Sequence, residues 1–101
     1  MGRLGILVNS DRHGRQALGL AQAARSLGHE VSVFVMDAGT RLLGDAAFMQ
    51  LAAIEGVRMS LCQHSAAHHR VATEGLPTSV VRGSQLNNAM MQHAADRVVV
   101  L

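Results

Sequence analysis

Short apolar runs alternate with amphipathic stretches along this sequence of 101 residues. Runs rich in β-branched residues predict five strands, at residues 4–8, 31–36, 57–61, 78–81 and 97–101. Apolar residues recur at helical spacing in the stretches between them, at residues 12–27, 47–54, 65–72 and 85–95. Residues 37–43 are expected to form a turn or a short helical piece. The pattern therefore predicts strands and helices in alternation.

The strands are continuous apolar runs, which suits a sheet that is covered on both faces. Helical connections between consecutive strands imply parallel pairing and right-handed crossovers. We therefore expect the α/β class, as a three-layer α/β/α sandwich with a five-stranded, mainly parallel sheet. The length fits one domain, so residues 1–101 are expected to form a single α/β domain.

Composition excludes several classes of function. All nine basic residues are arginines, and the lack of lysine excludes a Walker A phosphate loop and Schiff-base chemistry. The arginines are evenly spread and the only aromatic residues are two Phe, so the basic stripe with stacking aromatics that nucleic-acid binding uses is missing. No apolar run approaches the ~20 residues of a membrane span. We expect neither a nucleic-acid partner nor a membrane partner.

The location is predicted from the cysteine content and the first residues. A single Cys excludes a disulfide within the chain. The first residues form a short apolar run with no cleavage region after it, unlike a signal peptide. We therefore expect a soluble, cytoplasmic protein in a reducing compartment.

Ligands and reactive groups of an open parallel sheet lie at the carboxyl ends of its strands. Residues 9–14, 62–69 and 82–84 are expected there. Cys62 follows the third predicted strand and precedes a helix, whose positive end would lower the pKa of a thiol and favour the thiolate. His64 could pair with that thiolate or pass a proton, so Cys62 and His64 are the candidate catalytic residues. The alternative is a buried, inert cysteine.

The histidines raise a metal hypothesis. His64, His68 and His69 crowd the segment after Cys62, and residues 64 and 68 share a helix face. Cys62 with two of these histidines could hold zinc or copper. The spacing matches no established metal motif, so a solvated helix start is favoured and no metal or cofactor is expected. The loop of residues 9–15 has one glycine where dinucleotide loops have three, so a small-anion site there is a weaker alternative.

Several segments resemble the DsrE/DsrF-like family in their order and spacing. They are residues 6–10 with the alanine-rich helix and residues 28–31 that follow, residues 56–62, residues 81–84, Leu86 and residues 94–99. The family includes TusD-like sulfur-relay subunits and proteins of bacterial sulfur oxidation. The resemblance implies that Cys62 carries sulfur as a persulfide and needs no cofactor. It also implies a protein sulfur donor or acceptor, and assembly into a trimer, a hexamer or a mixed hexamer.

Three hypotheses about function follow. The first is a sulfur carrier of a sulfur relay, with sulfurtransferase activity, that passes the persulfide sulfur of Cys62 to a partner thiol. The second is a non-catalytic assembly or binding subunit in which Cys62 is incidental. The third is a Cys/His metal-binding protein. Whether the chain is an enzyme stays open at this stage.

Overall fold

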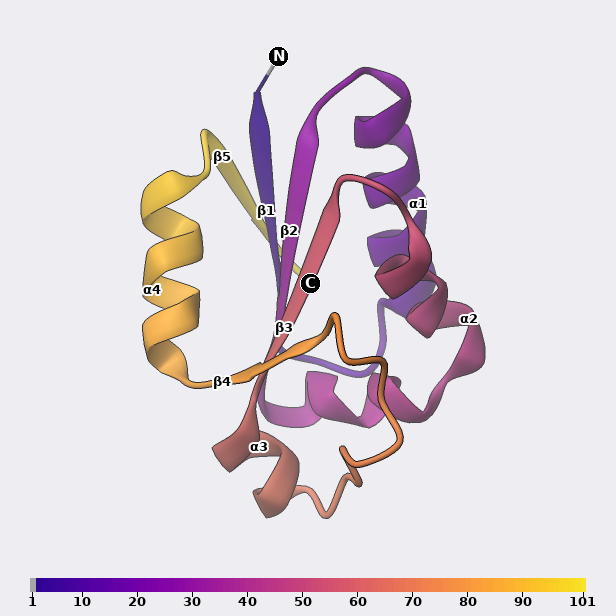
Figure 1. Cartoon of the computed structure of the whole chain (residues 1–101), viewed down its shortest axis with the longest axis vertical. Coiled ribbons are helices and arrows are strands. Elements are labelled where there is room, and N and C mark those ends of the chain that lie inside the picture. Colours follow the sequence, from indigo (N-terminus) through magenta and orange to yellow (C-terminus); the bar gives the residue numbers. More distant parts are fainter. Residues whose placement is uncertain (1) are drawn as a thin grey trace.

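The computed structural model describes residues 2–101 and contains one five-stranded sheet between two layers of helices (Figure 1). The strands are β1 (Arg3–Val8), β2 (Glu30–Val35), β3 (Val57–Cys62), β4 (Val81–Gly83) and β5 (Arg97–Val100). Their order in the sheet is β4-β3-β2-β1-β5, and each neighbouring pair is parallel. The predicted three-layer α/β/α fold with a parallel sheet is therefore confirmed.

The helical elements divide between the two faces and the carboxyl edge of the sheet. They are α1 (Gly14–Ser26), η1 (Asp37–Gly44), α2 (Ala46–Met49), η2 (Gln50–Ala53), α3 (Gln63–His68) and α4 (Gln85–Ala94), where η marks a 3₁₀ helix. Figure 1 shows α1 and α2 on one side of the sheet, α4 on the other, and α3 beyond the ends of the strands. Within residues 2–101, no helix has the length and apolar character needed to cross a membrane.

Two clusters of buried side chains hold the layers together. The larger lies between the sheet and α1 and includes Ile6, Val33 and Leu61. The smaller lies on the α4 side and contains Phe34, Cys62 and Met91. Because successive side chains of a strand point to opposite faces, Cys62 faces α4 whereas Leu61, the residue before it on β3, faces α1.

The fourth strand is the main correction to the sequence prediction. It was expected at residues 78–81 and is found at Val81–Gly83. Residues 77–80 form a turn instead, in which the Val80 N–H donates to the Pro77 carbonyl over 3.1 Å. Proline favours such a turn because its φ is fixed and it has no N–H to give to a sheet. The turn keeps the β-branched residues before Val81 out of the strand.

The predicted helix starts and ends shift for local reasons. Residues 12–27 were predicted as a helix capped by Ser10 or Asp11, but α1 begins at Gly14 with no side-chain cap. Ser10 instead donates to the Leu101 carbonyl over 2.6 Å, and Asp11 lies 3.4 Å from Arg41. The side chains expected to cap the helix are therefore used in contacts across the chain.

Two other predicted helices are shorter than expected. Residues 47–54 divide into α2 and η2, although Asp45 accepts the Ala47 N–H over 2.9 Å as a cap, as predicted. Residues 65–72 were expected to be helical, yet α3 spans Gln63–His68. Arg70 has a φ of 57°, a left-handed backbone that a right-handed helix cannot continue.

Candidate functional site

Cys62 occupies the position that the sequence predicts, at the carboxyl edge of the sheet. It is the last residue of β3 and the residue immediately before α3. Its exposed fraction is 4%, and it packs with Phe34 and Met91. On the neighbouring strand its register partner is Gly83, where a Cβ would collide with the Asn87 side chain. The edge of the sheet beside the thiol is therefore closely packed.

The surroundings of Cys62 favour a thiolate. Burial raises the pKa of the thiol, but nearby donors lower it by more: the hydroxyl and N–H of Ser65, the Gln85 side chain and the His64 N–H. The net effect is a pKa below the ordinary value of a cysteine. The Cys62 side chain makes no capping hydrogen bond of ordinary geometry to α3. These donors therefore stabilise chiefly the thiolate form of Cys62. A thiolate is the nucleophilic form of cysteine.

A row of side-chain amides along α4 ends at the two sulfur atoms of the site. Gln92 donates to Asn88 over 2.9 Å, and Asn88 donates to Oε1 of Gln85 over 3.1 Å. The Gln85 amide nitrogen then lies 3.6 Å from the Met36 sulfur. Because its oxygen accepts from Asn88, the Gln85 amide turns its N–H groups toward Met36 and Cys62. This row fixes the orientation of a donor that acts on the thiol.

Neither Ser65 nor Gln85 was predicted from the sequence. Ser65 lies in the first turn of α3, three residues after Cys62. This short spacing in the sequence could have indicated that its hydroxyl lies near the thiol. The polar spacing of residues 85, 88 and 92 along one helix was a second signal. The sequence predicts that residues 62–69 and 82–84 lie at one edge of the sheet, but nothing in it places the Gln85 side chain beside Cys62.

The histidines of the predicted cluster take separate roles. His64 is exposed and reaches Cys62 through its backbone N–H. Proton transfer by its imidazole stays a prediction. The rings of His68 and His69 meet edge to face with centroids 5.1 Å apart. His69 Nε2 lies 2.8 Å from Oδ1 of Asp37, so it contacts η1.

The structure gives no geometric support to the metal hypothesis for Cys62, His64 and His68. Within residues 2–101, no group of three His, Cys, Asp or Glu side chains is placed to hold a metal ion. His64 and His68 both lie in α3 and are four residues apart, as the hypothesis assumed, but this shared face does not bring them to Cys62 as a metal site.

The contact between Asp37 and His69 joins η1 to the end of α3. The hydrogen bond with His69 is the main cause that lowers the pKa of Asp37. Asp37 has a φ of 49°, a left-handed conformation that Asp and Asn adopt more readily than other residues with a side chain. Because Met36 precedes Asp37 and packs on the cluster with Cys62, this contact supports one wall of the site.

The other two predicted edge segments have structural contacts of their own. Arg82 faces away from the thiol, because its register partner is Leu61. Its guanidinium donates to three backbone carbonyls over 2.7–3.1 Å, those of Thr73, Leu76 and Val80. Ser84 caps α4 and forms a capping box with Asn87. In residues 9–14, Ser10 and Asp11 make the contacts described with the fold.

The fold and the site together define a class: small parallel α/β domains with a buried cysteine at the carboxyl edge of the sheet. The model of the DsrE/DsrF-like family matches residues 2–101, and the chain belongs to this family. No curated protein matches the chain.

Two solved structures have the same fold at low sequence identity. The ychN protein from E. coli superposes with a TM-score of 0.75 at 19% identity. The protein of unknown function MTH1491 from Methanobacterium thermoautotrophicum gives a TM-score of 0.68 at 13% identity. In both comparisons the match covers 100% of each chain. These likenesses confirm the fold.

Proposed function

We propose that this protein is a sulfur carrier that holds sulfur as a persulfide on Cys62 and passes it to a partner thiol. The observation that supports the proposal most is the lowered pKa of a cysteine at the carboxyl edge of the sheet, surrounded by hydrogen-bond donors. Membership of the DsrE/DsrF-like family agrees with a role related to sulfur relay.

The proposed chemistry consists of two exchanges between thiols. The Cys62 thiolate attacks the outer sulfur of a persulfide donor, a new S–S bond forms, and the donor leaves as a thiolate. A partner thiolate then attacks the outer sulfur on Cys62, and Cys62 leaves as a thiolate. Each step forms one S–S bond and breaks one, so no external oxidant or reductant is consumed. A low pKa makes Cys62 a good leaving group in the second step.

Access to the sulfur is part of the proposal. Cys62 is buried, whereas Gln85, which hydrogen-bonds it, is exposed. The sulfur therefore lies just beneath the surface at the start of α4. A sulfur donor reaches the Cys62 sulfur by displacing the Gln85 amide. The outer sulfur of the persulfide would then occupy the space that the amide leaves.

The direct test is incubation of the reduced protein with a small persulfide donor, followed by intact-mass measurement. We expect a species heavier by one sulfur atom, about 32 Da, that a thiol reductant removes. Transfer is then followed by adding a second protein thiol and measuring the loss of that mass. A protein that gains no sulfur over a range of donors would contradict the proposal.

Replacing Ser65 with alanine is expected to raise the pKa of Cys62, because it removes the hydroxyl that stabilises the thiolate. The proportion of thiolate near neutral pH should fall, and the reaction with a thiol reagent should slow by a few-fold. The measurement is the pH dependence of the labelling rate. Ser26→Ala is the matched control, since Ser26 bonds only the Gln22 carbonyl on α1. An unchanged profile in Ser65→Ala would remove Ser65 from the site.

The second candidate function, a non-catalytic assembly subunit, is favoured by a separate observation. The exposed large hydrophobic residues, apart from Leu27, lie on α4 or on strand positions that face it: Val81, Leu86, Met90, Val98 and Val100. We call these five the α4-side patch. The outer edge of β5 is also unpaired within residues 2–101. We propose that a second copy of the chain covers this patch, since a self-complementary patch gives a closed symmetric dimer or a larger ring.

Light scattering with size-exclusion chromatography tests the assembly. Met90→Glu is expected to shift an oligomer toward monomer, because it places a charge where the second copy would cover the α4-side patch. Leu27→Glu is the control, as Leu27 is 74% exposed and lies outside the patch. If the wild-type chain is a monomer at high concentration, a second copy does not cover the patch, and a heterologous sulfur donor or acceptor becomes the candidate.

We also propose that the protein acts in the cytoplasm, where a persulfide carrier meets reduced thiols.

A further inference from the structure

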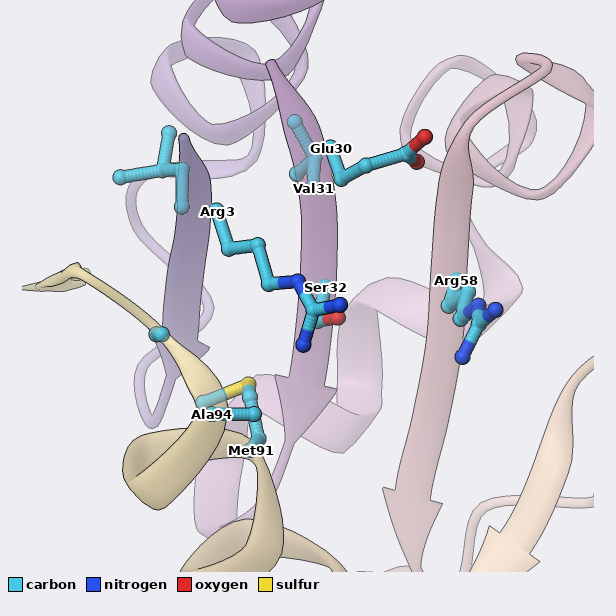
Figure 2. Close-up of a pocket in the computed structure, with 9 residues that line it drawn as sticks. Arg3, Glu30, Val31, Ser32, Arg58, Met91 and Ala94 are labelled. Carbon is cyan, nitrogen blue, oxygen red and sulfur yellow. The ribbon is translucent and has the colours of Figure 1, made fainter. Parts of the chain in front are cut away.

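A cavity of about 220 Å³ lies on the α4 side of the sheet near the amino ends of the strands. Its lining includes the side chains of Arg3, Ser32 and Arg58, together with Met91 and the last residues of α4 (Figure 2). Cys62 lies at the opposite end of β3. The cavity is therefore a separate feature from the candidate site, and an inference about it does not depend on the proposed function.

The cavity lies beside a closely packed contact between the sheet and the end of α4. Gly5, Ser32 and Arg58 are register neighbours on three adjacent strands, and the space above Gly5 is filled by Met91 of α4 and by Ala95, the residue after it. A Cβ at Gly5 would lie 3.3 Å from the Ala95 Cβ. The small side chain of Ser32 and the long side chain of Arg58 line the cavity next to this contact. The volume is below the roughly 300–1,000 Å³ of pockets for drug-sized ligands, so the cavity suits a small molecule.

Two guanidinium groups reach the cavity from strands on either side of β2. Arg3 is on β1 and Arg58 on β3, two residues out of register, so their backbones are about 12 Å apart at the usual strand spacing and rise. Figure 2 shows the Arg3 guanidinium lying across β2 beside Ser32. The ion pairs within residues 2–101 are Asp11 with Arg41 and Asp37 with His69. Neither Arg3 nor Arg58 is thus paired with a carboxylate there.

We propose that this cavity binds a tetrahedral oxyanion, sulfate or phosphate, between Arg3 and Arg58 with the Ser32 hydroxyl as a further donor. Guanidinium groups match such oxyanions because two N–H groups of one plane can bind two oxygens. The apolar floor formed by Met91 strengthens the attraction by excluding water from one side.

Two features of the cavity oppose an anion and make the proposal specific. Glu30 also lines it, although Figure 2 shows its carboxylate directed away from the Arg3 guanidinium. The last carbonyls of α4 carry partial negative charge. The positive charge of one guanidinium would be largely offset by the Glu30 carboxylate and these carbonyls, so anion binding should need both arginines. Removal of the Glu30 charge should strengthen anion binding.

The experiment is a titration of the wild-type protein with sodium sulfate and, separately, sodium phosphate at constant ionic strength. Binding is followed by amide chemical shifts, with sodium chloride as the reference anion. We expect saturable shifts for residues around Ser32, with a dissociation constant on the order of 1 mM. Whichever oxyanion binds more tightly identifies the preferred ligand.

Charge variants decide whether the cavity is responsible. Arg58→Gln and Arg3→Gln are each expected to weaken binding about tenfold, whereas Glu30→Gln is expected to tighten it roughly threefold. Arg15→Gln removes the same charge from an exposed position of α1 outside the lining and should leave binding unchanged. Equal weakening by Arg15→Gln and Arg58→Gln, or shifts that never saturate, would overturn the proposal. Circular dichroism confirms that each variant is folded.

Discussion

Cys62→Ser is expected to abolish persulfide formation completely, with no species that is heavier by one sulfur atom. Serine has nearly the same shape, but its hydroxyl stays protonated near neutral pH and supplies no sulfur atom to hold a persulfide. Because the side chain is 4% exposed within a packed cluster, an isosteric change should leave the fold intact. Intact-mass measurement after treatment with the donor, beside the wild type, gives the result.

The comparison with Ser65→Ala separates loss of the nucleophile from loss of its activation. That variant keeps the thiol, so it should still gain the sulfur atom, at a rate that recovers as the pH is raised. A gain of one sulfur atom on the Cys62→Ser protein, which has no cysteine, would mean that the sulfur is not held as a persulfide of Cys62. Full mass gain in the wild type with no later transfer to any thiol would leave a sulfur-binding protein instead of a carrier.

Gly39→Ala is expected to lower the free energy of unfolding by about 3 kcal/mol, near the upper end for overpacked positions. Gly39 is buried in η1, and a Cβ there would collide with the backbone carbonyl of Val8 at the end of β1. Backbone atoms of a central strand cannot move aside as a side-chain end can. For a chain of this length the midpoint of thermal unfolding should fall by roughly 15 °C, which urea and thermal unfolding both measure.

Gly19→Ala provides the matched control for that substitution. Gly19 lies in the interior of α1, and a Cβ would meet no atom within 4 Å. Alanine there should stabilise the protein by about 0.5–1 kcal/mol, because it restricts the unfolded chain. If Gly39→Ala stabilises the protein as Gly19→Ala does, the backbone of η1 is not as close to Val8 of β1 as the structure shows.

The sequence was sufficient for the fold because its signals are local. The β-branched runs that end at Val8 and Val35, and the cysteine that follows Leu61, can each be assigned from neighbouring residues. Their parallel pairing follows from the helices between them. The fourth strand was misplaced because Val80 and Val81 look alike in the sequence. Only the turn after Pro77, which Arg82 holds by its carbonyls, determines which of them enters the sheet.

The details of the candidate site were less predictable, since they depend on contacts between distant segments. Position relative to a strand end identified Cys62 from the sequence alone. Its hydrogen-bond partner Gln85 is brought to it by the packing of α4 across the sheet. The crowding of histidines near Cys62 suggested shared chemistry, but the fold directs His69 to Asp37. Distance along the chain therefore misrepresents which titratable groups meet.

The strand order has a consequence for how the protein is made. β1 pairs on one side with β2 and on the other with β5, from opposite ends of the chain. During synthesis, β1, β2, β3 and α1 precede α4 and β5, so the first three strands can pair before α4 covers their other face. Until then Phe34 and Cys62 lie on a bare face of the sheet. The thiol that is buried in the finished protein is thus exposed to oxidants and to other nascent chains from its own emergence until α4 packs over it.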